Sequence, residues 1–287
     1  MNKMTYIDTK IKCKDGELIA ATIYSPNKDP KGAILVAPAT GIKRQFYDNF
    51  AKYLAEHGYG VICFDNRGIG ESLTGNIKNS NASLQCWGEQ DMPAVLEQLK
   101  IDFPDTKYHL IGHSAGGQLV GLMDNALELN SIFNFGCSSG RLKNMNFLYR
   151  VKAKFFMNFF IPVNNILFGH TKAQWVGMGE PLPKNVAKQW QEWCNGQGYV
   201  KEAFGKTIFN HFYDELATPS LWVNAIDDEI ANNANVADML SVFPKLNAQT
   251  LTLNSKDFGL NEIGHMKFFS KKSQVLWDHT LEWLEVH

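Results

Sequence analysis

Short apolar segments alternate with segments of helical periodicity along most of this chain. Segments typical of buried strands lie at residues 33–37, 60–64, 108–112 and 131–137, and amphipathic stretches separate them. The alternation returns at residues 220–286. Strands joined through helices run parallel, and a parallel sheet needs helices on both faces. The sequence therefore predicts an α/β fold.

Residues 138–214 interrupt this alternation. Several aromatic side chains gather there, including Phe155, Phe156, Phe159, Phe160, Trp175, Trp190 and Trp193. Val186, Trp190 and Trp193 have the spacing of one helical face. We interpret residues 138–214 as a helical cap, or lid, over a core formed by residues 1–137 and 215–287. An ordinary pair of core helices is the alternative.

Composition narrows the possible partners and the cellular location. The chain has 287 residues and a net charge of -1, with the two signs mixed along its length, so it offers no electrostatic argument for binding nucleic acid or an anionic membrane. The most apolar window, residues 147–168, is too interrupted for stable membrane insertion. Five widely spaced cysteines predict no metal site and suggest a reducing compartment. The first residues hold no apolar stretch of signal-peptide length, and we expect a cytoplasmic protein.

Ser114 stands between two glycines, in the segment Gly112–His113–Ser114–Ala115–Gly116. This G-x-S-x-G pattern directly follows a predicted strand and precedes a helix predicted to reach Leu127. A serine on such a sharp turn needs neighbours without side chains, and the helix N-terminus offers N–H groups to a developing oxyanion. The segment therefore predicts a nucleophilic serine.

A nucleophilic serine needs a base and an acid, which in a parallel sheet come from loops after later strands. Asp227 and Asp228 follow the predicted strand at residues 220–226, and His265 follows the next strand. We predict Ser114, Asp228 and His265 as the catalytic residues. Asp227 stays the alternative acid, and Asp257 is interpreted as structural.

The chain resembles the α/β-hydrolases, and in particular bacterial predicted hydrolases of the serine-aminopeptidase-like group. Beside the serine motif, the resemblance rests on PATG at residues 38–41, DNRGIGES at residues 65–72 and IGHMKFF at residues 263–269. It implies a mostly parallel sheet of the eight-stranded type flanked by helices, with the helical cap inserted after the sixth strand. It also implies that residues 65–72 support the site without taking part in the chemistry.

In many relatives a His-Gly pair follows the early strand, where this chain has Ala37–Pro38. The oxyanion donors are backbone groups, so this change does not remove them. We predict the N–H groups of Ala115 and Thr40 as the oxyanion hole, with Ala39 and Gly41 as alternatives to Thr40. Substrate contacts are predicted for four residues: Gly41, His113, Trp190 and Trp193. For His113, packing is the competing role, because its side chain should point away from that of Ser114.

These residues predict a serine hydrolase that cleaves a small or acyl-chain ester, with a thioester or amide as variants and without a metal or cofactor. Ester cleavage is favoured over peptide cleavage. Three alternatives stay open: an acyltransferase with the same triad, an aminopeptidase-like peptidase that holds a substrate amine through Glu180, Glu192 or Glu202, and a non-enzymatic binding module. The sequence gives no oligomeric state.

Overall fold

The structure, a computed structural model, describes residues 4–287. Its centre is an eight-stranded sheet in the order β1-β2-β4-β3-β5-β6-β9-β10. The strands are β1 Thr5–Lys12, β2 Leu18–Ser25, β3 Gly32–Ala37, β4 Tyr59–Phe64, β5 Tyr108–His113, β6 Ser131–Phe135, β9 Pro219–Ala225 and β10 Asn247–Leu253. β1 and β2 are antiparallel to their neighbours, and the six others are parallel. The mostly parallel sheet predicted from the sequence is confirmed.

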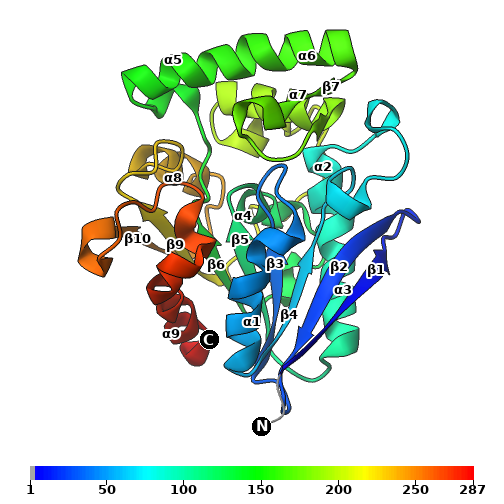
Figure 1. Cartoon of the computed structure of the whole chain (residues 1–287), viewed down its shortest axis with the longest axis vertical. Coiled ribbons are helices and arrows are strands. Elements are labelled where there is room, and N and C mark those ends of the chain that lie inside the picture. Colours follow the sequence, from blue (N-terminus) through cyan, green and yellow to red (C-terminus); the bar gives the residue numbers. More distant parts are fainter. Residues whose placement is uncertain (1–3) are drawn as a thin grey trace.

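Helices cover both faces of this sheet (Figure 1). The side chains of β3 are apolar on both faces of the sheet, so both faces need cover. Ile34 and Val36 belong to an apolar cluster with residues of α1 (Asp48–Glu56) and α9 (Asp278–Val286). Ala33, Leu35 and Ala37 belong to the cluster of the opposite layer. That second layer includes α3 (Met92–Asp102) and α8 (Asn233–Leu240). Side chains of successive strand residues point to opposite faces, so a strand apolar at every position is buried on both sides.

The helix expected to run from Ser114 to Leu127 is broken, and the prediction is wrong there. Only α4 (Ala115–Gln118) is α-helical, and two 3₁₀ turns follow it. Glycine weakens a helix interior by about 1 kcal/mol. Gly121 is also where the ring of Tyr213 approaches, because a Cβ at Gly121 would lie 2.5 Å from that ring. The chain around Gly121 therefore packs against Tyr213 and does not continue as an α-helix.

The chain between β6 and β9 lies over the carboxyl ends of the parallel strands (Figure 1). Its elements are α5 Phe147–Phe155, a π-helical turn Phe156–Phe160, α6 Ile161–Phe168, α7 Lys184–Asn195 and the two-residue strands β7 His170–Thr171 and β8 Leu182–Pro183. A short helix, α2 (Leu84–Cys86), approaches α7 from the sheet side. Val186 and Trp193 of α7 are buried, as their shared face predicts. Within residues 4–287 no helix is both long and apolar enough to cross a membrane.

Residues 65–72 form the loop after β4, and buried ion pairs hold it. Asp65 pairs with Arg44 at 2.6 Å, and Arg67 pairs with Asp91 at the same distance. None of residues 65–72 lines the pocket described below. The loop therefore does not face the space above Ser114.

Candidate active site

Ser114 lies on a strained turn between β5 and α4. Its φ is 49° and its ψ is -113°, a backbone conformation that non-glycine residues rarely adopt. Close packing imposes this turn, because a Cβ at Gly116 would lie 2.0 Å from the carbonyl oxygen of Ala37. A Cβ at Gly112 would lie 2.4 Å from Oδ1 of Asn134. Both glycines are therefore required by backbone approach, and the turn presents the Ser114 hydroxyl at the end of β5.

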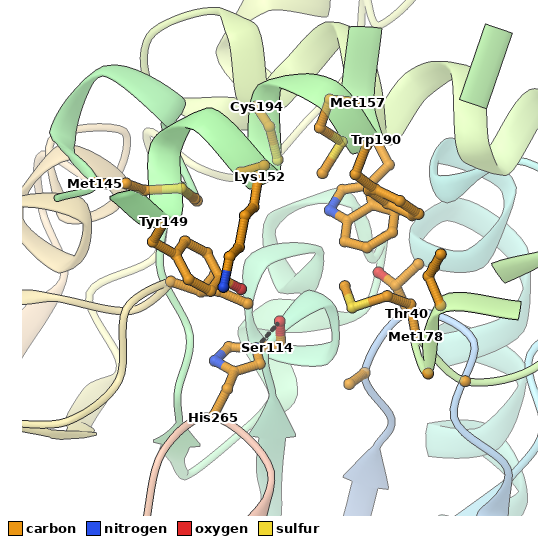
Figure 2. Close-up of a pocket in the computed structure, with 18 of the residues that line it drawn as sticks. Thr40, Ser114, Met145, Tyr149, Lys152, Met157, Met178, Trp190, Cys194 and His265 are labelled. Carbon is orange, nitrogen blue, oxygen red and sulfur yellow. Dashed lines mark hydrogen bonds between the residues drawn. The ribbon is translucent and has the colours of Figure 1, made fainter. Parts of the chain in front are cut away.

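Three predicted residues, far apart in the sequence, form one chain of hydrogen bonds. Oγ of Ser114 lies 3.0 Å from Nε2 of His265, and Nδ1 of His265 lies 2.8 Å from Oδ2 of Asp228. Figure 2 shows Ser114 and His265 facing one another beneath the pocket. With Nδ1–H donated to the carboxylate, Nε2 is free to accept the serine proton. This order of donor and acceptor activates a hydroxyl nucleophile.

Asp228 is buried and its carboxylate is fully engaged. Oδ1 accepts the backbone N–H groups of Ile230 and Ala231 at 2.9 and 2.8 Å, while Oδ2 accepts from His265. Burial alone would raise the pKa of Asp228, but the charge of His265 and these hydrogen bonds outweigh it and lower the pKa. The carboxylate is therefore ionised and able to stabilise a protonated imidazole.

The neighbouring Asp227 has a different place. It is exposed, and its carboxylate accepts the N–H groups of Ile263 and Gly264 at 2.9 and 3.0 Å. These are the two residues before His265. Asp227 therefore holds the histidine loop, and the structure brings Asp228, the acid preferred from the sequence, to the imidazole.

The loop after β3 and the start of α4 carry backbone N–H groups without acceptors. Across residues 4–287, none of Thr40, Gly41 and Ala115 donates its N–H to another group, whereas the N–H of Ala39 donates to the Tyr47 hydroxyl at 2.9 Å. Thr40 also borders the pocket beside Ser114 (Figure 2). The geometry therefore favours Thr40 over Ala39 as a donor to an oxyanion, and the assignment of Thr40 and Ala115 stays a prediction.

His113 does not face the pocket, and its predicted contact with substrate is corrected. It is fully buried, with Nδ1 2.8 Å from the Tyr47 hydroxyl and Nε2 3.0 Å from the backbone oxygen of His265. Since Nε2–H must donate to that carbonyl, Nδ1 accepts from Tyr47. Burial, followed by the charge of His265, lowers the pKa of His113 to about 3, so the ring is neutral. Neutral His113 links the loop after β3 to the loop of His265.

A cavity of about 790 Å³ opens directly above Ser114 and His265. Its wall is mostly apolar. Tyr149 of α5 and Met157 of the π-helical turn reach down into it, with Met145 from the loop before α5 and Trp190 from α7 (Figure 2). Lys152 extends from α5 toward the space over Ser114. Among the residues that line the cavity, all within the described chain, Lys152 is the only Lys, Arg, Asp or Glu.

Part of the chain is similar to known proteins in sequence. Residues 28–125 match the family model described as serine aminopeptidase, S33. The Candida albicans protein phosphatase methylesterase 1 is 31% identical over 99 residues, which are 34% of this chain and 26% of that protein. The chain thus matches about a quarter of the length of that curated relative. The family-model match includes Ser114 and ends before Asp228 and His265.

Solved structures match the whole fold. A soluble variant of the Saccharomyces cerevisiae monoglyceride lipase is 13% identical with a TM-score of 0.67, covering 100% of this chain and 95% of that one. A carboxyl esterase of Bacillus coagulans is 13% identical with a TM-score of 0.66 and 99% coverage of both chains. A Pyrococcus furiosus esterase is 13% identical with a TM-score of 0.64, covering 99% and 91%.

The chain has the fold of the α/β-hydrolases. Two further residues predicted to contact substrate lie outside the cavity. Trp193 is buried against Tyr199, with ring centroids 5.0 Å apart, and Gly41 is buried where its carbonyl oxygen accepts the N–H of Glu180. Both assignments are corrected, because packing of the segment onto the core uses these residues. Trp190 does line the cavity.

Sequence reasoning missed two residues of this candidate site. Tyr47 bridges Ala39 and His113, and Lys152 is the cation of the cavity. Neither carried a signal in the sequence, because each lies in a stretch of helical periodicity where its direction is set by tertiary packing. Within residues 4–287 no three His, Cys, Asp or Glu side chains gather as metal ligands.

Proposed function

We propose that this α/β-hydrolase is a serine esterase that cleaves carboxylic esters of small or acyl-chain substrates. The observation that carries the proposal is the hydrogen-bonded series from Ser114 through His265 to Asp228 beneath an apolar cavity. The named relatives, a methylesterase, a monoglyceride lipase and two esterases, agree with it. We also propose residues 138–214 as the lid, over the core of residues 1–137 and 215–287.

The proposed reaction has two steps. Oγ of Ser114 attacks the ester carbonyl while Nε2 of His265 takes the hydroxyl proton, and Asp228 stabilises the imidazolium. His265 then gives that proton to the departing alcohol, and an acyl-enzyme is left on Ser114. A water molecule, deprotonated by His265, releases the acid. The N–H groups of Thr40 and Ala115 receive the oxyanion in both steps, and one such donor contributes about 3–4 kcal/mol in comparable sites.

Charge at the cavity favours an ester over an amino-terminal peptide. An aminopeptidase needs a carboxylate for the substrate ammonium, and the cavity wall offers only Lys152. The three glutamates considered for that role are engaged elsewhere: Glu180 pairs with Lys43, Glu192 with Lys188, and Glu202 accepts the N–H of Gln197. A cation facing a cation in an apolar cavity is unfavourable.

A panel of nitrophenyl esters of increasing chain length, with matched amides and aminoacyl anilides, tests this proposal. Hydrolysis of the esters, absent in Ser114→Ala and much weaker with the anilides, is expected. Adding small alcohols to the assay separates a hydrolase from an acyltransferase, since transfer would yield a new ester in place of the acid. Esterase activity retained by Ser114→Ala would refute the assignment.

A further inference from the structure

Exposed apolar side chains gather on the outermost helices of the molecule. Of the nineteen large apolar side chains exposed within residues 4–287, nine lie in residues 147–176. We call these nine the α5–α6 face: Phe147, Leu148, Val151, Phe155, Phe159, Ile166, Leu167, Trp175 and Val176. Isolated exposed apolar residues are ordinary, but a concentration of this kind marks an interaction site.

Packing within the chain does not account for this face. No residue of α5 is buried, and Leu148 and Ile166 are 75% and 81% exposed. In Figure 1 α5 and α6 form the outer layer, farthest from the sheet, with α7 beneath them. The opposite side of the same segment, through Tyr149 and Met157, lines the cavity. The segment is therefore apolar on two sides, and only the inner side has a partner.

The same region is strongly basic. Residues 129–179 contain six basic residues and no acidic one, although the whole chain has a net charge of -1. They are Arg141, Lys143, Arg150, Lys152, Lys154 and Lys172. This corrects the expectation that the two signs are mixed along the chain. Within the described chain, no carboxylate pairs with Lys143, Lys152 or Lys154.

Charge selects among the possible occupants of the face. A second copy of this chain would bring the same six cations against one another, which opposes association. The surface of an anionic bilayer offers apolar interior to the exposed side chains and negative headgroups to the lysines and arginines around them. An amphipathic helix with basic residues beside its apolar face is suited to lie in that interface.

The cavity opens within this face. Val151, Phe155 and Val176 belong to the exposed apolar set and also line the cavity above Ser114. We propose that the α5–α6 face docks on an anionic lipid surface, with the cavity entrance turned toward the bilayer. The docking rests on surface residues alone and is independent of the proposed esterase activity.

Flotation with lipid vesicles tests the docking directly. The full chain is mixed with vesicles of phosphatidylcholine alone, or of phosphatidylcholine with phosphatidylglycerol, and the bound fraction is measured. Binding to the anionic vesicles is expected, together with a decrease as salt is added, because screening weakens exposed charges. The absence of binding to anionic vesicles at low salt would overturn the proposal.

Three variants identify the surface. Leu148→Asp with Ile166→Asp should lower partitioning by about tenfold or more, since two large side chains leave the apolar phase. Lys143→Glu with Lys154→Glu should lower it about 25-fold, at roughly fivefold per basic residue. Ile101→Asp, at a 70% exposed site on α3, is the control and should bind as the parent does.

These variants separate docking from catalysis and from self-association. None of the substituted residues lines the cavity, so hydrolysis of a water-soluble short ester should be unchanged in all three. If the esterase proposal fails, vesicle binding is still measurable. Equal loss in the Ile101→Asp control would contradict the assigned surface. Sedimentation velocity gives the second contradicting outcome. It is a dimer that Leu148→Asp with Ile166→Asp dissociates, while neither the parent nor the variant binds vesicles.

Discussion

Replacing Asp228 by asparagine should leave the fold in place and move the proton of neutral His265 from Nδ1 to Nε2. Oδ1 of Asp228 accepts two backbone N–H groups, from Ile230 and Ala231, and Oδ2 accepts Nδ1–H of His265. An asparagine has one acceptor oxygen and one NH₂ group. Its oxygen should face the two fixed N–H groups, and its NH₂ group then faces Nδ1. His265 would adopt the tautomer with Nε2–H, which cannot take the proton of Ser114.

The expected loss is large. A triad aspartate changed to asparagine in an intact geometry lowers kcat about 10⁴-fold, because the imidazole has the wrong tautomer. That factor corresponds to about 5.5 kcal/mol of transition-state stabilisation. The hydrogen bonds to the backbone are kept, so the free energy of unfolding should change much less.

The neighbouring acid supplies a matched control. Asp227→Asn keeps one acceptor for Ile263 or Gly264 and loses the other, which loosens the loop of His265. A hydrogen bond to a charged group contributes about 1.5–3 kcal/mol. If all of it were lost from the positioning of His265, turnover would fall by roughly 10- to 150-fold. Asp228→Asn should therefore be the slower variant by a factor of about 70 to 1000.

Both variants are assayed for kcat on a nitrophenyl ester, with circular dichroism and urea unfolding as checks on folding. A larger loss in Asp227→Asn than in Asp228→Asn would refute the reasoning. So would an Asp228→Asn variant that is folded and keeps more than about a tenth of the parent turnover, since the tautomer argument requires a far greater effect.

Three further results are expected. Gly116→Ala should lower the free energy of unfolding, measured in urea, by about 3 kcal/mol or more, because its Cβ would lie 2.0 Å from the Ala37 carbonyl oxygen. The control Gly75→Ala has open space around its Cβ and only backbone strain, so it should lower that free energy by about 1–2 kcal/mol. Equal losses in the two variants would contradict the close approach at Gly116. Burial lowers the pKa of His113 from 6.5 to about 3, so the contribution of the neutral ring to stability should be present above pH 6.5 and be lost as pH falls toward 3. The free energy of unfolding of His113→Gln should therefore depend less on pH in that window than that of the parent. Lys152→Met should lower kcat/KM up to about fivefold for esters with a carboxylate on the acyl chain, because it removes the cation of the cavity wall. Neutral esters of equal length should keep their kcat/KM. An equal loss for both kinds of ester would mean that Lys152 acts by packing.

The sequence predicted the parallel sheet because β3, β4, β5, β6 and β9 are apolar along their length, and burial on both faces leaves that pattern little freedom. The antiparallel β1 and β2 were not identified. In β1 most side chains are exposed, so apolar periodicity gives little signal there. The glycines around Ser114 predicted the turn correctly, because their spacing is visible in the sequence, although the groups that require them, at Ala37 and Asn134, are remote.

Features set by distant contacts could not be predicted in the same way. His113 is turned away from the cavity by the Tyr47 hydroxyl and the His265 carbonyl, two partners remote in sequence. Asp227 and Asp228 are adjacent aspartates, and they differ only in the direction of their side chains after β9. The gathering of aromatic residues in 138–214 did not show which of them face solvent, and the structure leaves Phe155 and Phe159 exposed.

The central claim is that His265 activates the Ser114 hydroxyl as a nucleophile, and fluorophosphonate labelling measures it most directly. We expect a single adduct per folded chain, located by peptide mass spectrometry on Ser114, absent in Ser114→Ala and strongly slowed in Asp228→Asn. A folded protein that takes up no label, or takes it up equally in Ser114→Ala, would show that Ser114 is not an activated nucleophile.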